Sequence, residues 1–220
     1  MRLEDLGLIG NCQFSALIEN TGAVVWCCLP RFDAEPVFST LLDERDGGRF
    51  LVGPADGSHG VQRYLDNTNV LETTFRSADG TFRVLDFAPR FPQHERMFRP
   101  TQLFRIVEPI DGAPRMRVQC DPRLGWSKAT PQALQGSNHI QFDGFASPLR
   151  LTTDIPPSYL GGQPFALTER RHLALTWGTS IEEPLAGLSE RFLHDTTQYW
   201  RRWVKHCNIP PMFQQEVIRS

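Results

Sequence analysis

The sequence predicts a mainly β protein, an antiparallel sandwich followed by helical segments. Apolar and β-branched runs of roughly four to eight residues recur through most of the chain, separated by Gly, Pro, Asn and Asp. About a dozen short strands at this spacing favour an antiparallel sandwich over a parallel α/β sheet. After about Glu183 the apolar residues instead follow helical spacing, which predicts a long helix.

Three pairs of apolar runs carry hairpin signals. They are residues 14–19 with 23–29, 69–77 with 81–88, and 103–110 with 115–120. Their linkers read Asn-Thr-Gly, Ala-Asp-Gly and Asp-Gly-Ala-Pro, and such residues suit tight turns between antiparallel strands. Further strands are expected at 139–144, 149–154, 165–171 and 172–178.

One helix is expected to interrupt the strands, at residues 35–44, "EPVFSTLLDE". Asp33 is its candidate N-cap, and Pro36 is tolerated in a first helical turn. Val37, Leu41 and Leu42 would then line one face of this helix.

The long helix expected after the strands covers residues 184–208, with Ser189 as its candidate N-cap. Its apolar stripe comprises Leu188, Phe192, Tyr199, Trp200, Trp203 and Cys207. A stripe this broad must pack against a substantial surface. Residues 209–220 begin another apolar-periodic segment without a C-cap glycine, which predicts an incomplete helix.

Composition and charge argue against nucleic-acid and membrane partners. The 220 residues carry a net charge of −2, and no basic cluster exceeds the Arg201-Arg202 pair, so no nucleic-acid partner is expected. No apolar run approaches the roughly 20 residues that cross a bilayer, and no membrane partner is expected. Acidic residues interrupt the N-terminal segment "MRLEDLGLIGNC" where a signal peptide needs an apolar core. The expected compartment is therefore the cytoplasm, where the five cysteines would stay reduced.

The residues that bind metals and cofactors form no known pattern. Six histidines and five cysteines are scattered, without C-x-x-C spacing or closely spaced histidines. Adjacent Cys27 and Cys28 would point to opposite faces of a strand and not share a metal. No P-loop, G-x-G-x-x-G or G-x-S-x-G motif is present. We expect no metal and no cofactor, with both cysteines filling a buried strand.

The stretch "LPRFDAEP", residues 29–36, is the strongest local candidate for a functional loop. Arg31 offers a planar donor fork, Phe32 a stacking face and Asp33 a hydrogen-bond acceptor, a set that suits sugar hydroxyls. In the structural alternative, Arg31 pairs with a nearby acid such as Asp33, Phe32 fills the core and Asp33 caps the helix. The residues alone leave both interpretations open. Glycoside hydrolysis needs two convergent carboxylates, and the spacing of the many acids does not show which of them converge.

Several stretches match one known family in order. Residues 8–50 contain "LIGNCQF" and "WCCLPRFD", residues 63–91 contain "TNVLETTF" and "LDFAPRF", and residues 196–203 read "TTQYWRRW". Together they resemble the N-terminal region of glycoside hydrolase family 15, the glucoamylase and trehalase family. Leu124 and Trp126 depart from the family's Pro-Arg-Phe-x-Tyr pattern in "CDPRLGWS".

The resemblance implies a super-β-sandwich at residues 1–183, a helical linker at 184–208 and the start of a truncated (α/α)6 catalytic barrel at 209–220. In the family, two glutamates of that barrel hydrolyse an α-glucosidic bond with inversion, and no residue of this chain matches either one. The chain alone is therefore expected to be inactive. Its implied partners are the barrel and, through it, an α-glucoside such as trehalose or a maltooligosaccharide. Arg31, Phe32 and Asp33 would border the barrel mouth and its sugar site.

A second interpretation is a stand-alone carbohydrate-binding or assembly module. Trp126, Trp177 or Phe32 would then be exposed and would stack on sugar rings.

Overall fold

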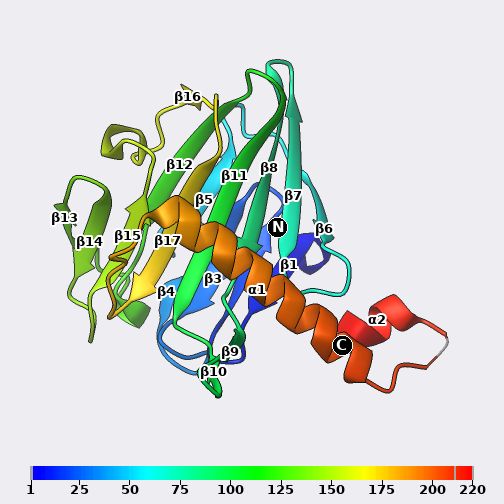
Figure 1. Ribbon diagram of the computed structural model, residues 1–220. Helices are drawn as coiled ribbons and strands as arrows, with labels where there is room; N and C mark the ends of the chain where they lie inside the picture. Colours follow the sequence, from blue (N-terminus) through cyan, green and yellow to red (C-terminus); the bar gives the residue numbers. More distant parts are fainter. Residues whose placement is uncertain (1, 211, 220) are drawn as a thin grey trace.

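The structure is a computed structural model that describes residues 2–210 and 212–219. Two large antiparallel sheets pack face to face, and helix α1 (Leu185–His206) lies across the outer face of one of them (Figure 1). The predicted fold class, a mainly β antiparallel sandwich followed by a helix, is confirmed.

Within the described residues, one sheet has seven strands and the other has eight. The seven-stranded sheet comprises β1 (Leu6–Gly10), β2 (Ser15–Glu19), β3 (Ala23–Cys28), β5 (Arg49–Pro54), β12 (Arg115–Asp121) and β16 (Phe165–Ala166) in that spatial order, with β4 (Pro36–Phe38) paired to β3. The eight-stranded sheet runs β13 (Gln132–Gln135), β14 (His139–Asp143), β15 (Leu149–Thr153), β17 (Arg171–Trp177), β11 (Gln102–Gly112), β8 (Gly80–Phe87), β7 (Leu71–Ser77) and β6 (Val61–Tyr64). A small hairpin pairs β9 (Phe91–Gln93) with β10 (Arg96–Phe98), three short 3-10 turns cover Leu3–Asp5, Gly125–Ser127 and Pro157–Tyr159, and helix α2 covers Gln214–Arg219.

Strand β11 separates two hydrophobic cores by the alternation of its side chains. Leu103 and Val107 point into the core between the sheets. Phe104 and Ile106 point to the other face, into a second core that α1 completes with Phe192. The rings of Phe104 and Phe192 meet edge to face with centroids 5.4 Å apart. The eight-stranded sheet is therefore buried on both faces where α1 crosses it.

Arg105 occupies the same strand and points between the sheets. Its Nε and Nη2 donate to the two carboxylate oxygens of Asp86, at 2.7 and 3.2 Å. Its Nη1 donates to the carbonyl oxygen of Phe50 in strand β5 of the facing sheet at 2.8 Å, and its Nη2 donates to that of Gly22 in the β2–β3 turn of the same sheet at 2.7 Å. Both charged side chains are fully buried. This ion pair therefore fastens one sheet to the other.

Two of the three predicted hairpins are confirmed, β2–β3 and β7–β8. The amide of Gly22 closes the first turn on the carbonyl of Glu19, and its φ of +85° is one that glycine adopts readily. The third hairpin prediction is wrong. Strand β11 pairs with β8 and β17, whereas β12 pairs with β5 in the other sheet, so residues 113–114 carry the chain across the sandwich.

The helix predicted at residues 35–44 is also wrong. Pro36–Phe38 form strand β4, and turns follow it. Val37 and Phe38 are both buried, so neighbouring side chains face apolar surroundings on both sides, which a one-faced helix does not provide. Asp43 organises the following turn, because its Oδ1 accepts from the amides of Arg45 and Asp46.

The long helix runs Leu185–His206 and carries the predicted apolar stripe except Cys207, which is its C-cap, with Leu188 and Phe192 buried against the sheet. Its N-cap is Pro184, so the assignment of Ser189 as N-cap is wrong. Ser189 instead lies in the second turn and is fully buried. The short α2 falls within residues 209–220, where an incomplete helix was expected.

Candidate functional site

The loop between β3 and β4 presents the three candidate residues at the surface. Arg31 donates from Nε and Nη2 to Asp33 Oδ1 and Oδ2, at 2.9 and 3.0 Å. This hydrogen-bonded partner lowers the pKa of Asp33 below its ordinary value. Phe32 is 65% exposed, so it does not fill the core. The structural alternative is therefore correct for the Arg31–Asp33 pair and wrong for Phe32 and for Asp33 as a helix cap.

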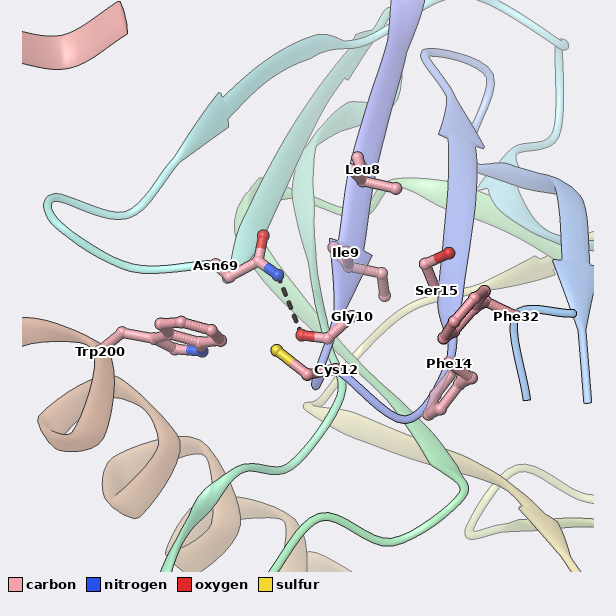
Figure 2. Close-up of a pocket in the computed structure, with 9 residues that line it drawn as sticks. All are labelled: Leu8, Ile9, Gly10, Cys12, Phe14, Ser15, Phe32, Asn69 and Trp200. Carbon is pink, nitrogen blue, oxygen red and sulfur yellow. Dashed lines mark hydrogen bonds between the residues drawn. The ribbon is translucent and has the colours of Figure 1, made fainter. Parts of the chain in front are cut away.

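Phe32 borders a hollow of about 320 Å³ at this end of the sandwich (Figure 2). The lining residues are Leu8, Ile9, Gly10, Cys12, Phe14, Ser15, Phe32, Asn69 and Trp200. Figure 2 shows Phe32 and Trp200 on opposite sides, with the end of β1 between them. The Asn69 side chain is held against the end of β1, because its Nδ2 donates to the Gly10 carbonyl oxygen at 2.9 Å.

The turn from β1 to β2 is built around the buried side chain of Asn11. Its Oδ1 accepts from the amides of Gln13 and Phe14, at 3.0 and 3.4 Å. Its Nδ2 donates to the carbonyl oxygens of Pro89 and Pro100, at 3.1 and 2.7 Å. One amide therefore shapes the floor of the hollow and ties it to the segments on either side of the β9–β10 hairpin.

Arg90 connects this turn to α1. Its Nη1 donates to the Asn11 carbonyl oxygen at 2.6 Å, and its Nε donates to the Tyr199 hydroxyl at 2.8 Å. Its backbone amide donates to Thr196 Oγ1 at 3.2 Å. The guanidinium also lies over the rings of Tyr199 and Trp200, at 5.2 and 5.9 Å from their centroids. Arg90 thus holds Trp200 in the wall of the hollow.

Of the candidate residues predicted from the sequence, only Phe32 lines the hollow. Arg31 and Asp33 flank Phe32 in the chain. Trp126 is exposed and packs on Trp26 with ring centroids 6.2 Å apart, and Trp177 is half-buried against Phe145. Neither tryptophan lines the hollow.

Sequence reasoning missed the residues that organise this end of the molecule: Asn11, Asn69 and Arg90. All three lie within quoted motifs, Asn11 in "LIGNCQF", Asn69 in "TNVLETTF" and Arg90 in "LDFAPRF", and these motifs were the available signal. Asn11 also accepts from the nearby amides of Gln13 and Phe14. The other side-chain hydrogen bonds of these residues reach partners 59 or more positions away, so no local pattern specifies them.

The arrangement suits binding more than acid–base chemistry. None of the nine lining residues is acidic, whereas glycoside hydrolysis needs two carboxylates on either side of the bond.

Cys27 and Cys28 are buried in β3, and burial raises the pKa of both thiols, which keeps them protonated. Among the described residues, no three His, Cys, Asp or Glu side chains are grouped to hold a metal ion. No helix in the described part of the chain is long and apolar enough to cross a membrane.

Comparison with known proteins places the chain among trehalase relatives. A family model described as "Trehalase-like, N-terminal" matches residues 1–155. The trehalase of Thermoplasma acidophilum is 25% identical over 214 residues, which cover 93% of this chain and 36% of the relative. The trehalase of Mycobacterium tuberculosis is 27% identical over 235 residues, covering 94% and 34%. Trehalase 1 of Sulfolobus acidocaldarius is 40% identical over 87 residues, covering 40% and 15%. No solved structure showed significant similarity.

The chain spans about a third of the length of the first two of these relatives, and the matches extend over nearly all of it. The family match covers well over half of the described residues and includes the strands, the loop and the turn that build most of the hollow. The chain therefore belongs to the trehalase-like N-terminal domain family.

Proposed function

We propose that the chain is the non-catalytic N-terminal domain of an α-glucoside hydrolase of the trehalase or glucoamylase type. In this proposal its hollow end packs against a catalytic barrel, and Arg31, Phe32 and Asp33 border the sugar site. The observation that carries the proposal is an aromatic-walled hollow without acidic residues, in a domain whose relatives are trehalases.

The surface around the hollow has the character of an interface. Leu8, Phe32 and Trp203 are 50%, 65% and 45% exposed, and Trp203 packs on Trp200 of the hollow wall with centroids 5.9 Å apart. Grouped exposed apolar and aromatic side chains are typical of surfaces that a partner covers. The barrel is the partner that the relatives' greater length supports.

The loop would contribute to sugar binding through two kinds of contact. Phe32 offers an exposed ring face, and pyranose rings bind aromatic faces through their apolar C–H surface. The Arg31–Asp33 pair satisfies its own charges and still has free donor and acceptor positions for hydroxyls. The catalytic acid and base would come from the barrel.

Glucose release tests the proposal. The 220-residue chain is assayed with trehalose and maltose, next to the protein extended through the reading frame beyond Ser220. We expect no release by the chain alone and release by the extended protein. Release by the purified chain would contradict a non-catalytic role, and so would a frame that encodes no further domain.

Trp126 supports one alternative, a stand-alone carbohydrate-binding module. It is 58% exposed and braced by Trp26, as a stacking platform would be. Titration with maltooligosaccharides, followed by tryptophan fluorescence, separates the two functions. Saturable binding by the isolated chain that Trp126→Ala abolishes would favour the module, whereas a flat titration favours the proposed domain.

A further inference from the structure

His172 lies between α1 and the sheet on which the helix packs. It belongs to β17 and points to the outer face, and its side chain is 6% exposed. Its Nδ1 lies 2.7 Å from Asp154 Oδ2, just beyond β15, and its backbone amide donates to Asp154 Oδ1 at 2.8 Å. Its Nε2 lies 3.3 Å from Glu190 Oε1, which belongs to α1. The ring therefore bridges two carboxylates from different elements.

We propose that His172 is a protonation-dependent clamp that fixes the first turns of α1 to the sheet as an imidazolium and loosens them when it loses its proton.

Hydrogen bonding to Asp154 and Glu190 at the same time requires the protonated ring of His172. An ionised carboxylate can only accept hydrogen bonds, so each ring nitrogen must donate. Only the imidazolium donates from both nitrogens. A neutral ring keeps one N–H and turns a lone pair toward the other carboxylate.

The geometry also decides which contact is lost. The Asp154 contact is the shorter one, and the backbone amide of His172 supports the same carboxylate. A neutral ring therefore keeps its proton on Nδ1 and directs the lone pair of Nε2 at Glu190. The contact that weakens is the one to the helix.

Further charged groups surround the His172 ring and its two carboxylate partners. On the helix side, Arg170 Nε lies 2.9 Å from Glu190 Oε1, and Arg170 Nη1 lies 3.7 Å from Glu108 of β11. On the other side, Arg171 donates to the Asp154 carbonyl oxygen at 3.3 Å and pairs with Glu169 at 2.8 Å. Burial of the ring lowers the pKa of His172, but the hydrogen bonds and charges of Asp154 and Glu190 outweigh it, and the pKa is raised above its ordinary value.

The direction of the pH effect follows from that raised pKa. The clamp is fully engaged below the ordinary histidine pKa of about 6.5 and is lost as the pH rises through the pKa of the folded protein. The apolar contacts of Leu188 and Phe192 with the sheet do not depend on pH, so the expected change is more frequent local opening of the first helical turns and not detachment of the helix.

Hydrogen exchange between about pH 5 and 9, corrected for intrinsic exchange rates, tests the clamp together with an NMR titration of His172. Protection of residues 185–192 should fall as His172 titrates, by about tenfold for each unit by which its pKa exceeds 6.5. His172→Gln should give low protection at every pH. His194→Gln is the matched control, because His194 is exposed on the same helix, and it should behave as the parent does.

Glu190→Gln keeps the test decisive if His172→Gln does not fold. It should lower the pKa of His172 and flatten the pH dependence of exchange. A pKa below 6.5 for His172, protection that does not change as His172 titrates, or an equal loss in His194→Gln would overturn the proposal.

Discussion

Replacing Arg105 with methionine should destabilise the sandwich more than any surface change. Methionine keeps much of the side-chain volume but removes the donors to Asp86, Phe50 and Gly22. Asp86 would remain as a buried charge without a partner, and two carbonyl oxygens would lose their donors. Breaking a buried ion pair by removing one partner costs about 3–5 kcal/mol. At about 2–4 °C per kcal/mol for a domain of this size, the melting temperature should fall by about 6–20 °C.

The chain supplies a matched control for this prediction. Arg31 and Asp33 form the same bidentate Arg–Asp pair at the surface, and Arg31→Met should leave the denaturation midpoint nearly unchanged. Urea unfolding of both variants measures the difference in free energy of unfolding. The double variant Arg105→Met/Asp86→Leu should recover part of the loss, because it leaves no buried charge unpaired. Equal midpoints for Arg105→Met and Arg31→Met would refute the role of the buried pair in joining the sheets.

Three further variants test the hollow and its surroundings. Arg90→Met should release Trp200 from the wall and shift tryptophan fluorescence, with a loss of about 1.5–3 kcal/mol because hydrogen bonds from a charged group disappear; an unchanged spectrum and midpoint would contradict this. Phe32→Ala should change the free energy of unfolding by less than about 0.5 kcal/mol, since the ring is exposed, yet raise KM for trehalose in the extended protein; an unchanged KM would remove Phe32 from the sugar site. Hydrogen bonding to Lys128 lowers the pKa of Asp43 to about 2, so its stabilising effect should be present above about pH 4 and be lost as the pH falls through 2; in Lys128→Met, NMR should find the pKa of Asp43 nearer its ordinary value.

The local sequence was enough to predict a hairpin where the turn itself joins two paired strands. The Asn-Thr-Gly and Ala-Asp-Gly turns predicted two hairpins because the paired strands directly flank them. Asp-Gly-Ala-Pro looks the same in sequence but carries the chain to the other sheet. The difference is that β11 pairs with β8 and β12 pairs with β5, and both of these partners come from earlier parts of the chain.

The wrong helix and the missed site residues share a physical cause. Residues 35–44 have helical propensity and a plausible cap, but burial of both Val37 and Phe38 beside β3 outweighs it. Arg90 and Asn11 are polar residues whose roles depend on partners that only the folded sandwich brings near. The loop at Arg31–Asp33 was predicted as a candidate because its residue types are unusual together, and the fold then placed Phe32 at the hollow.

Hydroxyl-radical footprinting of the chain alone and of the extended protein tests most directly whether the hollow end is covered by a catalytic barrel. Phe32 and Trp203 report on the surface around the hollow. Trp126 is the control, since its exposed fraction of 58% lies between the 65% of Phe32 and the 45% of Trp203 and it does not line the hollow. The account predicts that Phe32 and Trp203 lose reactivity severalfold in the extended protein while Trp126 keeps it. Equal reactivity of Phe32 and Trp203 in both proteins would contradict it.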